Sequence, residues 1–366
     1  MASIDDRIRE IEEEIRRTPY NKATQHHIGK LKAKLARLRD EREKRLAGKG
    51  SGRRFDVKRC GDSSVGIVGP PSVGKSTLLN RLTEANSEVG EYEFTTINVV
   101  PGVLRYKGAR IQVLDLPGLI RGASTGRGRG REVLSVIRSC DLLLILLDVF
   151  QPEQFGVIEE ELYKAGIRLD QKPPDVTIKK SKFGGVRLFS TVNLSHLDQS
   201  LVRTVLNEYG IHSAEVLIRE DITLDQFIDV VQDNRCYIPS IVVLNKTDLA
   251  TPSLVEQAKS RFNRRVVAVS AERGTNLEEL KEAIYEKLGL IRVYLKPQGG
   301  DPDLREPLVV KRDSTVLDVC KALHRDFVEG FRYAQVWGRS VRFSGQIVGP
   351  NHVLQDGDIV TIIKRR

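Results

Sequence analysis

An eight-residue stretch in the first quarter of the chain has the residue types and spacing that bind a chain of phosphates. It consists of Gly69-Pro70-Pro71-Ser72-Val73-Gly74-Lys75-Ser76 and follows the apolar run 65–68. Glycines in such a loop let backbone N–H groups turn inward, where they form a nest for phosphate oxygens. Lys75 would reach the β- and γ-phosphates, Ser76 would ligate Mg²⁺, and a helix beginning near Lys75 would direct its positive end at the same anion. The remaining nucleotide contacts are expected from Ser72, Val73, Gly74 and Thr77.

A second motif, Asn245-Lys246-Thr247-Asp248, ends an apolar run and has the residue types that select guanine. The Asp248 carboxylate can accept hydrogen bonds from guanine N1–H and from the 2-amino group. Adenine offers neither donor and would leave a buried carboxylate unpaired, which is costly. Lys246 would lie along the base, and Asn245 would brace the surrounding loops. In Ser270-Ala271, which ends the last expected strand of the same sheet, the N–H of Ala271 would donate to guanine O6.

A third motif, Asp115-Leu116-Pro117-Gly118, is typical of a loop that senses the γ-phosphate. Asp115 would hold a Mg²⁺-bound water, and the Gly118 N–H would contact the γ-phosphate. Thr96, of the pair Thr95-Thr96, is expected to complete the Mg²⁺ shell. The predicted catalytic residues are therefore Lys75, Thr96 and Gly118, and the predicted metal ligands are Ser76, Thr96 and Asp115.

The residue after this motif is Leu119, which cannot orient the attacking water as the glutamine of Ras-like proteins does. Unassisted hydrolysis is expected to be slow, on the order of 10⁻⁴–10⁻³ per second. A partner, a monovalent cation or another loop must then supply the missing charge stabilisation. The arginines of the following glycine-rich loop, residues 122–131, would be catalytic, bind RNA or simply be solvated.

Composition and charge limit the class of protein. The chain has 366 residues, of which 40% are hydrophobic and 30% charged, as in a globular protein. The longest apolar run, 142–149, is too short to span a membrane, and residues 1–6 do not resemble a signal peptide. We therefore expect a cytoplasmic protein with no membrane partner. The four cysteines are widely separated without a C-x-x-C pair, which argues against zinc and against a disulfide framework: Cys60, Cys140, Cys236 and Cys320.

The formal net charge of +10 fits a nucleic-acid partner, since neutralising phosphates releases counterions. A solvated basic surface is the alternative, and nothing indicates specificity for DNA. The excess is concentrated in residues 31–60, which hold twelve Lys/Arg and four Asp/Glu. This basic region would contact RNA or would dock on the next domain.

The periodicity of apolar residues predicts the elements that position these motifs. Isoleucines at steps of four and three predict a helix over 4–17, and Thr18-Pro19 predicts the start of a second helix. From residue 63, strands alternate with helices, as in a parallel α/β sheet. The segment between Asp148 and Ile241 is too long for one crossover. It therefore predicts an inserted α+β domain, with a hairpin of 176–180 and 186–192.

The last 75 or so residues have the pattern of a β-grasp module, with one helix over 316–327 crossing a small mixed sheet that includes a strand at Arg342-Phe343. The predicted domains are a basic helical hairpin at 1–55, a nucleotide-binding domain at 60–169 and 236–289, an inserted domain at 170–235, and the β-grasp domain at 290–366. The fold class is α/β, with a P-loop domain built on a mainly parallel sheet.

Together these motifs resemble those of the developmentally regulated GTP-binding proteins, in the Obg-related branch of translation-associated GTPases. The resemblance covers nearly the whole chain and rests on Gly69–Ser76, 94–96, Asp115–Gly118, 126–131, Asn245–Asp248 and Ser270-Ala271. It implies a terminal TGS domain, an insertion with the fold of the second domain of ribosomal protein S5, and association with ribosomes. It also implies a regulatory partner protein, which eukaryotic members bind. Leu119 implies stimulation by K⁺, although many potassium-dependent relatives have asparagine where this chain has Ser72.

The sequence thus predicts a Mg²⁺-dependent enzyme that hydrolyses GTP to GDP and acts as a ribosome- or RNA-associated switch in translation. The alternative is an RNA- or ribosome-binding adaptor in which the nucleotide is mainly structural. A third hypothesis, ATP hydrolysis, is disfavoured by Asp248.

Overall fold

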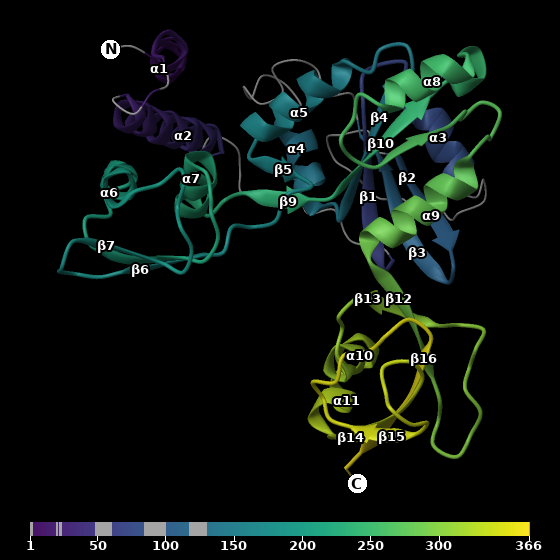
Figure 1. The fold of residues 1–366 in the computed structure, drawn as a ribbon. Helices are drawn as coiled ribbons and strands as arrows, with labels where there is room; N and C mark the ends of the chain where they lie inside the picture. Colours follow the sequence, from purple (N-terminus) through teal and green to yellow (C-terminus); the bar gives the residue numbers. More distant parts are fainter. Residues whose placement is uncertain are drawn as a thin grey trace. The chain divides into compact units, whose positions relative to one another are not determined.

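The computed structural model describes residues 3–19, 21, 24–47, 61–83, 100–116 and 130–365 (Figure 1). The chain divides into two compact units. One consists of Met1–Phe55, Ser124–Gly128 and Leu162–Tyr237, and the other of Asp56–Ala123, Arg129–Glu161 and Ile238–Arg366. Among the described helices, none is both long enough and apolar enough to cross a bilayer.

A six-stranded sheet, in the order β11-β10-β4-β1-β3-β2, is the centre of the second unit. Its strands are β1 (Ser63–Val68), β2 (Val100–Tyr106), β3 (Ala109–Asp115), β4 (Leu142–Asp148), β10 (Ser240–Asn245) and β11 (Val266–Ala268). All neighbours are parallel except β2 and β3, which pair antiparallel. The prediction of a mainly parallel sheet is confirmed, and its antiparallel pair, β2 and β3, turns at Lys107-Gly108.

Helices on this sheet bury the apolar residues of its strands, as continuous apolar strands require. They are α3 (Lys75–Leu82), α4 (Gly130–Ser139), α5 (Gln154–Lys164), α8 (Pro252–Lys259) and α9 (Leu277–Leu288). Every residue of β1 is buried, and one core cluster joins Leu78 of α3 and Ile284 of α9 to the strands. Because the parallel strands share one direction, the loops that leave their carboxyl ends meet at one edge.

The same unit ends in a five-stranded sheet ordered β13-β12-β16-β14-β15. Its elements are β12 (Leu290–Leu295), β13 (Leu308–Lys311), α10 (Val316–Leu323), α11 (Arg325–Glu329), β14 (Phe331–Trp337), β15 (Gln346–Val348) and β16 (Asp358–Lys364). The predicted single helix is divided at His324, whose extended backbone caps α11. The predicted strand at Arg342-Phe343 is wrong, because the N–H of Arg342 donates to the side chain of Gln346 and the edge strand begins only there.

The inserted segment forms a three-stranded sheet covered by two helices. Its elements are β6 (Val176–Lys180), β7 (Val186–Ser190), α6 (Gln199–Glu208), β8 (Ala214–Ile218) and α7 (Leu224–Gln232). The predicted hairpin is wrong, because β8 lies between β6 and β7 and pairs with both. The strands β7 and β8 run parallel and are joined through α6, the usual helical crossover for parallel neighbours.

Two N-terminal helices, α1 (Ile4–Arg17) and α2 (Gln25–Ala47), pack on each other through the predicted isoleucine seam. The predicted start of α2 at Thr18 is wrong. Thr18 caps the C-terminus of α1, and its hydroxyl donates to the Glu14 carbonyl. On α2, Ala33 belongs to the core of the insertion, and a Cβ at Gly29 would lie 2.4 Å from Leu201 Cδ1 of α6. Within the described ranges, the basic helix is therefore docked on the insertion, and not on the domain that follows it in the sequence, which was one of the two predicted alternatives.

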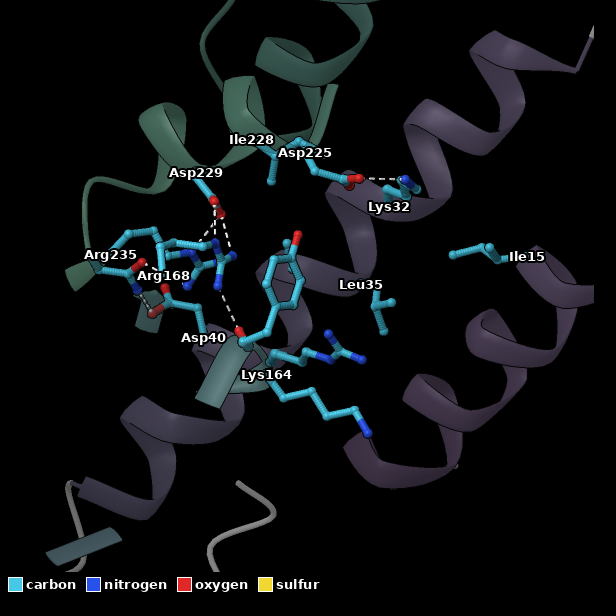
Figure 2. Close-up of a pocket in the computed structure, with 14 residues that line it drawn as sticks. Ile15, Lys32, Leu35, Asp40, Lys164, Arg168, Asp225, Ile228, Asp229 and Arg235 are labelled. Atoms are coloured by element: carbon cyan, nitrogen blue, oxygen red, sulfur yellow. Dashed lines mark hydrogen bonds and ion pairs between the residues drawn. The ribbon is translucent and has the colours of Figure 1, made fainter. Parts of the chain in front are cut away.

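A buried ion cluster lies at the base of the insertion, beside the short pair β5 (Ile167–Leu169) and β9 (Cys236–Ile238). Arg168, only 3% exposed, donates two hydrogen bonds of 2.7 and 2.8 Å to Asp229 of α7, and Arg235 donates a third of 2.7 Å (Figure 2). The Arg168 guanidinium also lies 3.7 Å from the ring centre of Tyr163. One buried carboxylate thus holds two cations beside a cavity of about 260 Å³.

We expect Asp229→Asn to lower the free energy of unfolding of this unit by about 3–5 kcal/mol, because two arginines would lose their shared anion. The matched control is Asp225→Asn in the same helix. It breaks a part-exposed pair with Lys32 and should cost about 1 kcal/mol or less. Amide hydrogen exchange in α7 measures both. If the two variants lost equal free energy of unfolding, the larger contribution expected of the buried cluster would be contradicted.

Candidate nucleotide-binding site

The loop between β1 and α3 depends on two glycines at close approaches. A Cβ at Gly69 would lie 2.3 Å from the Leu146 carbonyl oxygen. Gly74 has a φ of 92°, and a Cβ there would lie 2.5 Å from Asn245 Nδ2. Any larger residue would force the loop away from β4 or from the Asn245 side chain. This explains in physical terms why glycine stands at both positions.

Lys75, the first residue of α3, is held over its own loop. Its Nζ donates to the carbonyl oxygens of Gly69 and Pro70, at 3.2 and 2.8 Å. Burial lowers the pKa of Lys75, and the nearby Asp115 carboxylate opposes that shift. The ammonium group is thus a partly desolvated cation, which an anion would stabilise.

Two predicted metal ligands lie side by side. The Ser76 hydroxyl, in the first turn of α3, donates to Asp115 Oδ2 at 2.6 Å. The contact follows from the sheet, because β1 pairs with β3 in parallel and Ile67 lies opposite Asp115. A hydroxyl and a carboxylate are hard oxygen donors, the ligands that Mg²⁺ prefers. The predicted Thr96 and Gly118, and the residue Leu119, lie outside the described residues.

Asn245, at the end of β10, connects the phosphate loop to the loop after β11. Its Nδ2 donates to the Val73 carbonyl at 2.8 Å, and its Oδ1 accepts from the Ala271 N–H at 2.9 Å. The side chain is buried, so both halves of the amide must find partners. This changes one expectation. The Ala271 N–H predicted to face guanine O6 donates instead to Asn245 Oδ1.

Asp248 lies in a turn of 3-10 helix directly after β10. Its Oδ1 accepts a hydrogen bond of 2.7 Å from the Ser270 hydroxyl, which lowers the pKa of Asp248. Arg273 Nε lies 3.7 Å from the other carboxylate oxygen. The Ser270 hydrogen bond and the Arg273 cation thus favour the ionised form of this carboxylate. Of the predicted residues, Thr77 lies part-buried in α3, and Ser72 is exposed in the loop with a φ of 61°.

Two residues near this site were not predicted from the sequence motifs. Asp148 ends β4 and accepts from Lys246 Nζ at 2.8 Å, which fixes the lysine beside the base loop. Its position at a strand end next to β1 and β10 is a signal that strand order would have revealed. Arg273 follows Ser270-Ala271 in a polar turn and has no comparable signal.

Comparisons with known proteins support the assignment of these loops to a GTPase domain. The family model described as a 50S ribosome-binding GTPase matches residues 64–180. A model of the C-terminal region of the same domain type matches residues 183–290, and a TGS domain model matches residues 291–364.

Three relatives match over nearly their whole length. A GTP-binding protein of Methanocaldococcus jannaschii is 57% identical over 100% of this chain and 94% of that protein. Ribosome-interacting GTPase 1 of Saccharomyces cerevisiae is 47% identical over 100% of both chains. Developmentally-regulated GTP-binding protein 1 of Xenopus laevis is 48% identical over 98% of both. This chain therefore belongs to the developmentally regulated GTP-binding proteins, a family of P-loop GTPases that carry a TGS domain.

Proposed function

We propose that this protein is a Mg²⁺-dependent GTP hydrolase that acts as a ribosome-associated switch in translation. The observation that carries the proposal is the bridge made by Asn245, which donates to the Val73 carbonyl and accepts from the Ala271 N–H and so joins the phosphate loop to the base loops. The yeast relative's name and the 50S ribosome-binding family model support association with ribosomes. Such a switch would work in the cytoplasm and would respond to a regulatory protein partner.

In this proposal, the phosphate loop binds the triphosphate through its backbone N–H groups and Lys75. The ammonium group exchanges its carbonyl partners, Gly69 and Pro70, for the β- and γ-phosphates. Ser76, Asp115 and Thr96 would hold Mg²⁺, which when bound neutralises charge on the phosphate oxygens. The Gly118 N–H would contact the γ-phosphate. The roles of Thr96 and Gly118 rest on the sequence motifs alone.

Asp248 selects guanine by accepting from N1–H and the 2-amino group. Ser270 orients this carboxylate through the 2.7 Å hydrogen bond, and Asp148 holds Lys246 for its contact with the base. Adenine would leave the Asp248 carboxylate without two of its partners. The site is therefore built for a guanine nucleotide.

Turnover by the isolated chain is slow in this proposal, because Leu119 supplies no group to orient water. A protein partner or a monovalent cation such as K⁺ provides the missing stabilisation. The N-terminal hairpin (1–55), the insertion with an S5-like fold (170–235) and the TGS domain (290–366) would transmit the state of the GTPase domain (60–169 and 236–289) to the ribosome.

Asp248→Asn is expected to lower the affinity for GTP on the order of 10²-fold, because two hydrogen bonds to a charged group are removed. The same change should raise the affinity for xanthosine triphosphate, whose 2-carbonyl can accept from the new amide. Isothermal titration with both nucleotides measures this. Glu272→Gln, an exposed carboxylate in the next loop, is the matched control and should change neither affinity. Unaltered GTP binding by Asp248→Asn would exclude the base assignment.

Lys75→Ala is expected to slow GTP turnover on the order of 10²-fold or more, because a positioned cation on the phosphates is removed. Phosphate release under single-turnover conditions measures this in KCl and in NaCl. The surface variant Lys259→Ala should keep the wild-type rate.

The comparison of the two salts tests the role of K⁺. Faster turnover of the wild type in KCl supports stimulation by K⁺, whereas equal rates in KCl and NaCl rule out potassium and leave the protein partner as the source of the missing stabilisation.

A further inference from the structure

The inserted sheet has one covered face and one open face. Val186, Val216 and Ile218 are buried in a single cluster with residues of α6 and α7, and both helices lie on the same side of the strands (Figure 1). Because strand residues alternate between faces, the residues between them point the other way. The open face is formed by Thr177, Lys179, Arg187, Phe189, Glu215 and Leu217.

The strand register arranges this open face in two rows. Leu217 of β8 lies between Thr177 of β6 and Phe189 of β7, and in the next row Glu215 lies between Lys179 and Arg187. Phe189 is 50% exposed, although the helix-covered face of the same sheet was available to bury an apolar ring. The aromatic ring therefore stands on the open face, beside a row in which two cations flank Glu215.

A second aromatic residue is displayed by the segment that crosses from β6 to β7. Phe183 is 87% exposed. The crossing is held in one conformation: the Ser181 hydroxyl donates to the Phe183 carbonyl at 3.0 Å, and the Gly185 N–H donates to Ser213 Oγ at 3.3 Å. Gly184, with a φ of 106°, makes the turn that follows the ring. At full extension, the six residue-to-residue steps from Phe183 to Phe189 would span roughly 20 Å.

The charge around these rings is strongly positive. Residues 172–190 contain five Lys/Arg and a single acidic residue, Asp175. Among the described residues, no carboxylate lies within ion-pair distance of Lys179, Lys180 or Lys182. Arg187 has only a 4.0 Å contact with Glu215, in which both side chains are more than half exposed.

The basic helix α2 differs from this face. Lys32, Arg39 and Arg42 pair with Asp225, Glu12 and Asp5, at 2.7, 2.6 and 3.2 Å. Those cations are already used to hold α2 to the insertion and to α1. The lysines around Phe183 and Phe189 have no such internal partner in the described structure.

We propose that the open face of β6–β8–β7 binds single-stranded RNA. Unpaired bases would stack on Phe183 and Phe189, and their phosphates would lie against Lys179 and Lys182. Exposed rings with unpaired lysines fit RNA better than a protein partner, because lysine is depleted at protein interfaces. This inference rests on the proposed association with ribosomes, which would supply the RNA. It deepens that proposal by naming the surface that the RNA would contact.

Fluorescence anisotropy of the full chain with a labelled oligouridylate tests the proposal. The double variant Phe183→Ala/Phe189→Ala should weaken binding by at least about tenfold, since each stacked base contributes roughly that much or more. The double variant Lys179→Gln/Lys182→Gln should reduce the slope of log affinity against log salt by about 0.7 for each phosphate that the protein no longer neutralises. Phe343→Ala, an exposed ring of the terminal domain at 63%, is the matched control and should leave binding unchanged.

GTP turnover and far-ultraviolet circular dichroism are measured on the same variants. Wild-type turnover and a wild-type spectrum show that the variant chain is folded and still acts as a GTPase. A failure of the RNA proposal can therefore be told apart from a failure of the GTPase proposal. Undetectable RNA binding by the wild type, or equal RNA binding by wild type and the phenylalanine variant, would overturn the proposal. Weaker ribosome binding by that variant with unchanged RNA affinity would also overturn it and would indicate a protein contact.

Discussion

The side chain of Asn245 is the constraint on which the nucleotide site depends. A buried amide must satisfy both its donor and its acceptor, and here it does so on two different loops, at the Val73 carbonyl and the Ala271 N–H. The close approach leaves no room for a Cβ at Gly74. One residue at the end of β10 therefore fixes the distance between the phosphate loop and the loops that are predicted to bind the base.

The insertion also depends on one buried polar side chain. The Asp229 carboxylate holds Arg168 and Arg235 where the chain enters and leaves the insertion, and α2 covers the outer side of its helices. The helices cover one face of the three-stranded sheet and leave its other face open. The buried charges pair with one another at the base, whereas in the part of the chain that the structure describes Lys179 and Lys182 have no carboxylate partner, and this is where the RNA surface is proposed.

Much of this could be predicted because the motifs are local. The phosphate loop, Asp115 and Asp248 each follow an apolar strand, and parallel strands bring their carboxyl ends to one edge. Two of the errors concern contacts between distant segments, which no periodicity reveals: β8 separates β6 from β7, and Asn245 takes the N–H of Ala271. Both depend on partners brought together only by the complete fold. The error at Thr18 is local, because its hydroxyl caps α1 by donating to the Glu14 carbonyl four residues earlier.

Sedimentation of the protein with ribosomes tests the central claim most directly, because a switch must bind its target differently in its two nucleotide states. The measurement is made with a non-hydrolysable GTP analogue, with GDP and without nucleotide. The account predicts that the protein co-sediments with ribosomes in the GTP analogue and is released in GDP, with Lys75→Ala failing to respond to either. Equal co-sedimentation in all three conditions would contradict a nucleotide switch and would favour an adaptor in which the nucleotide is structural.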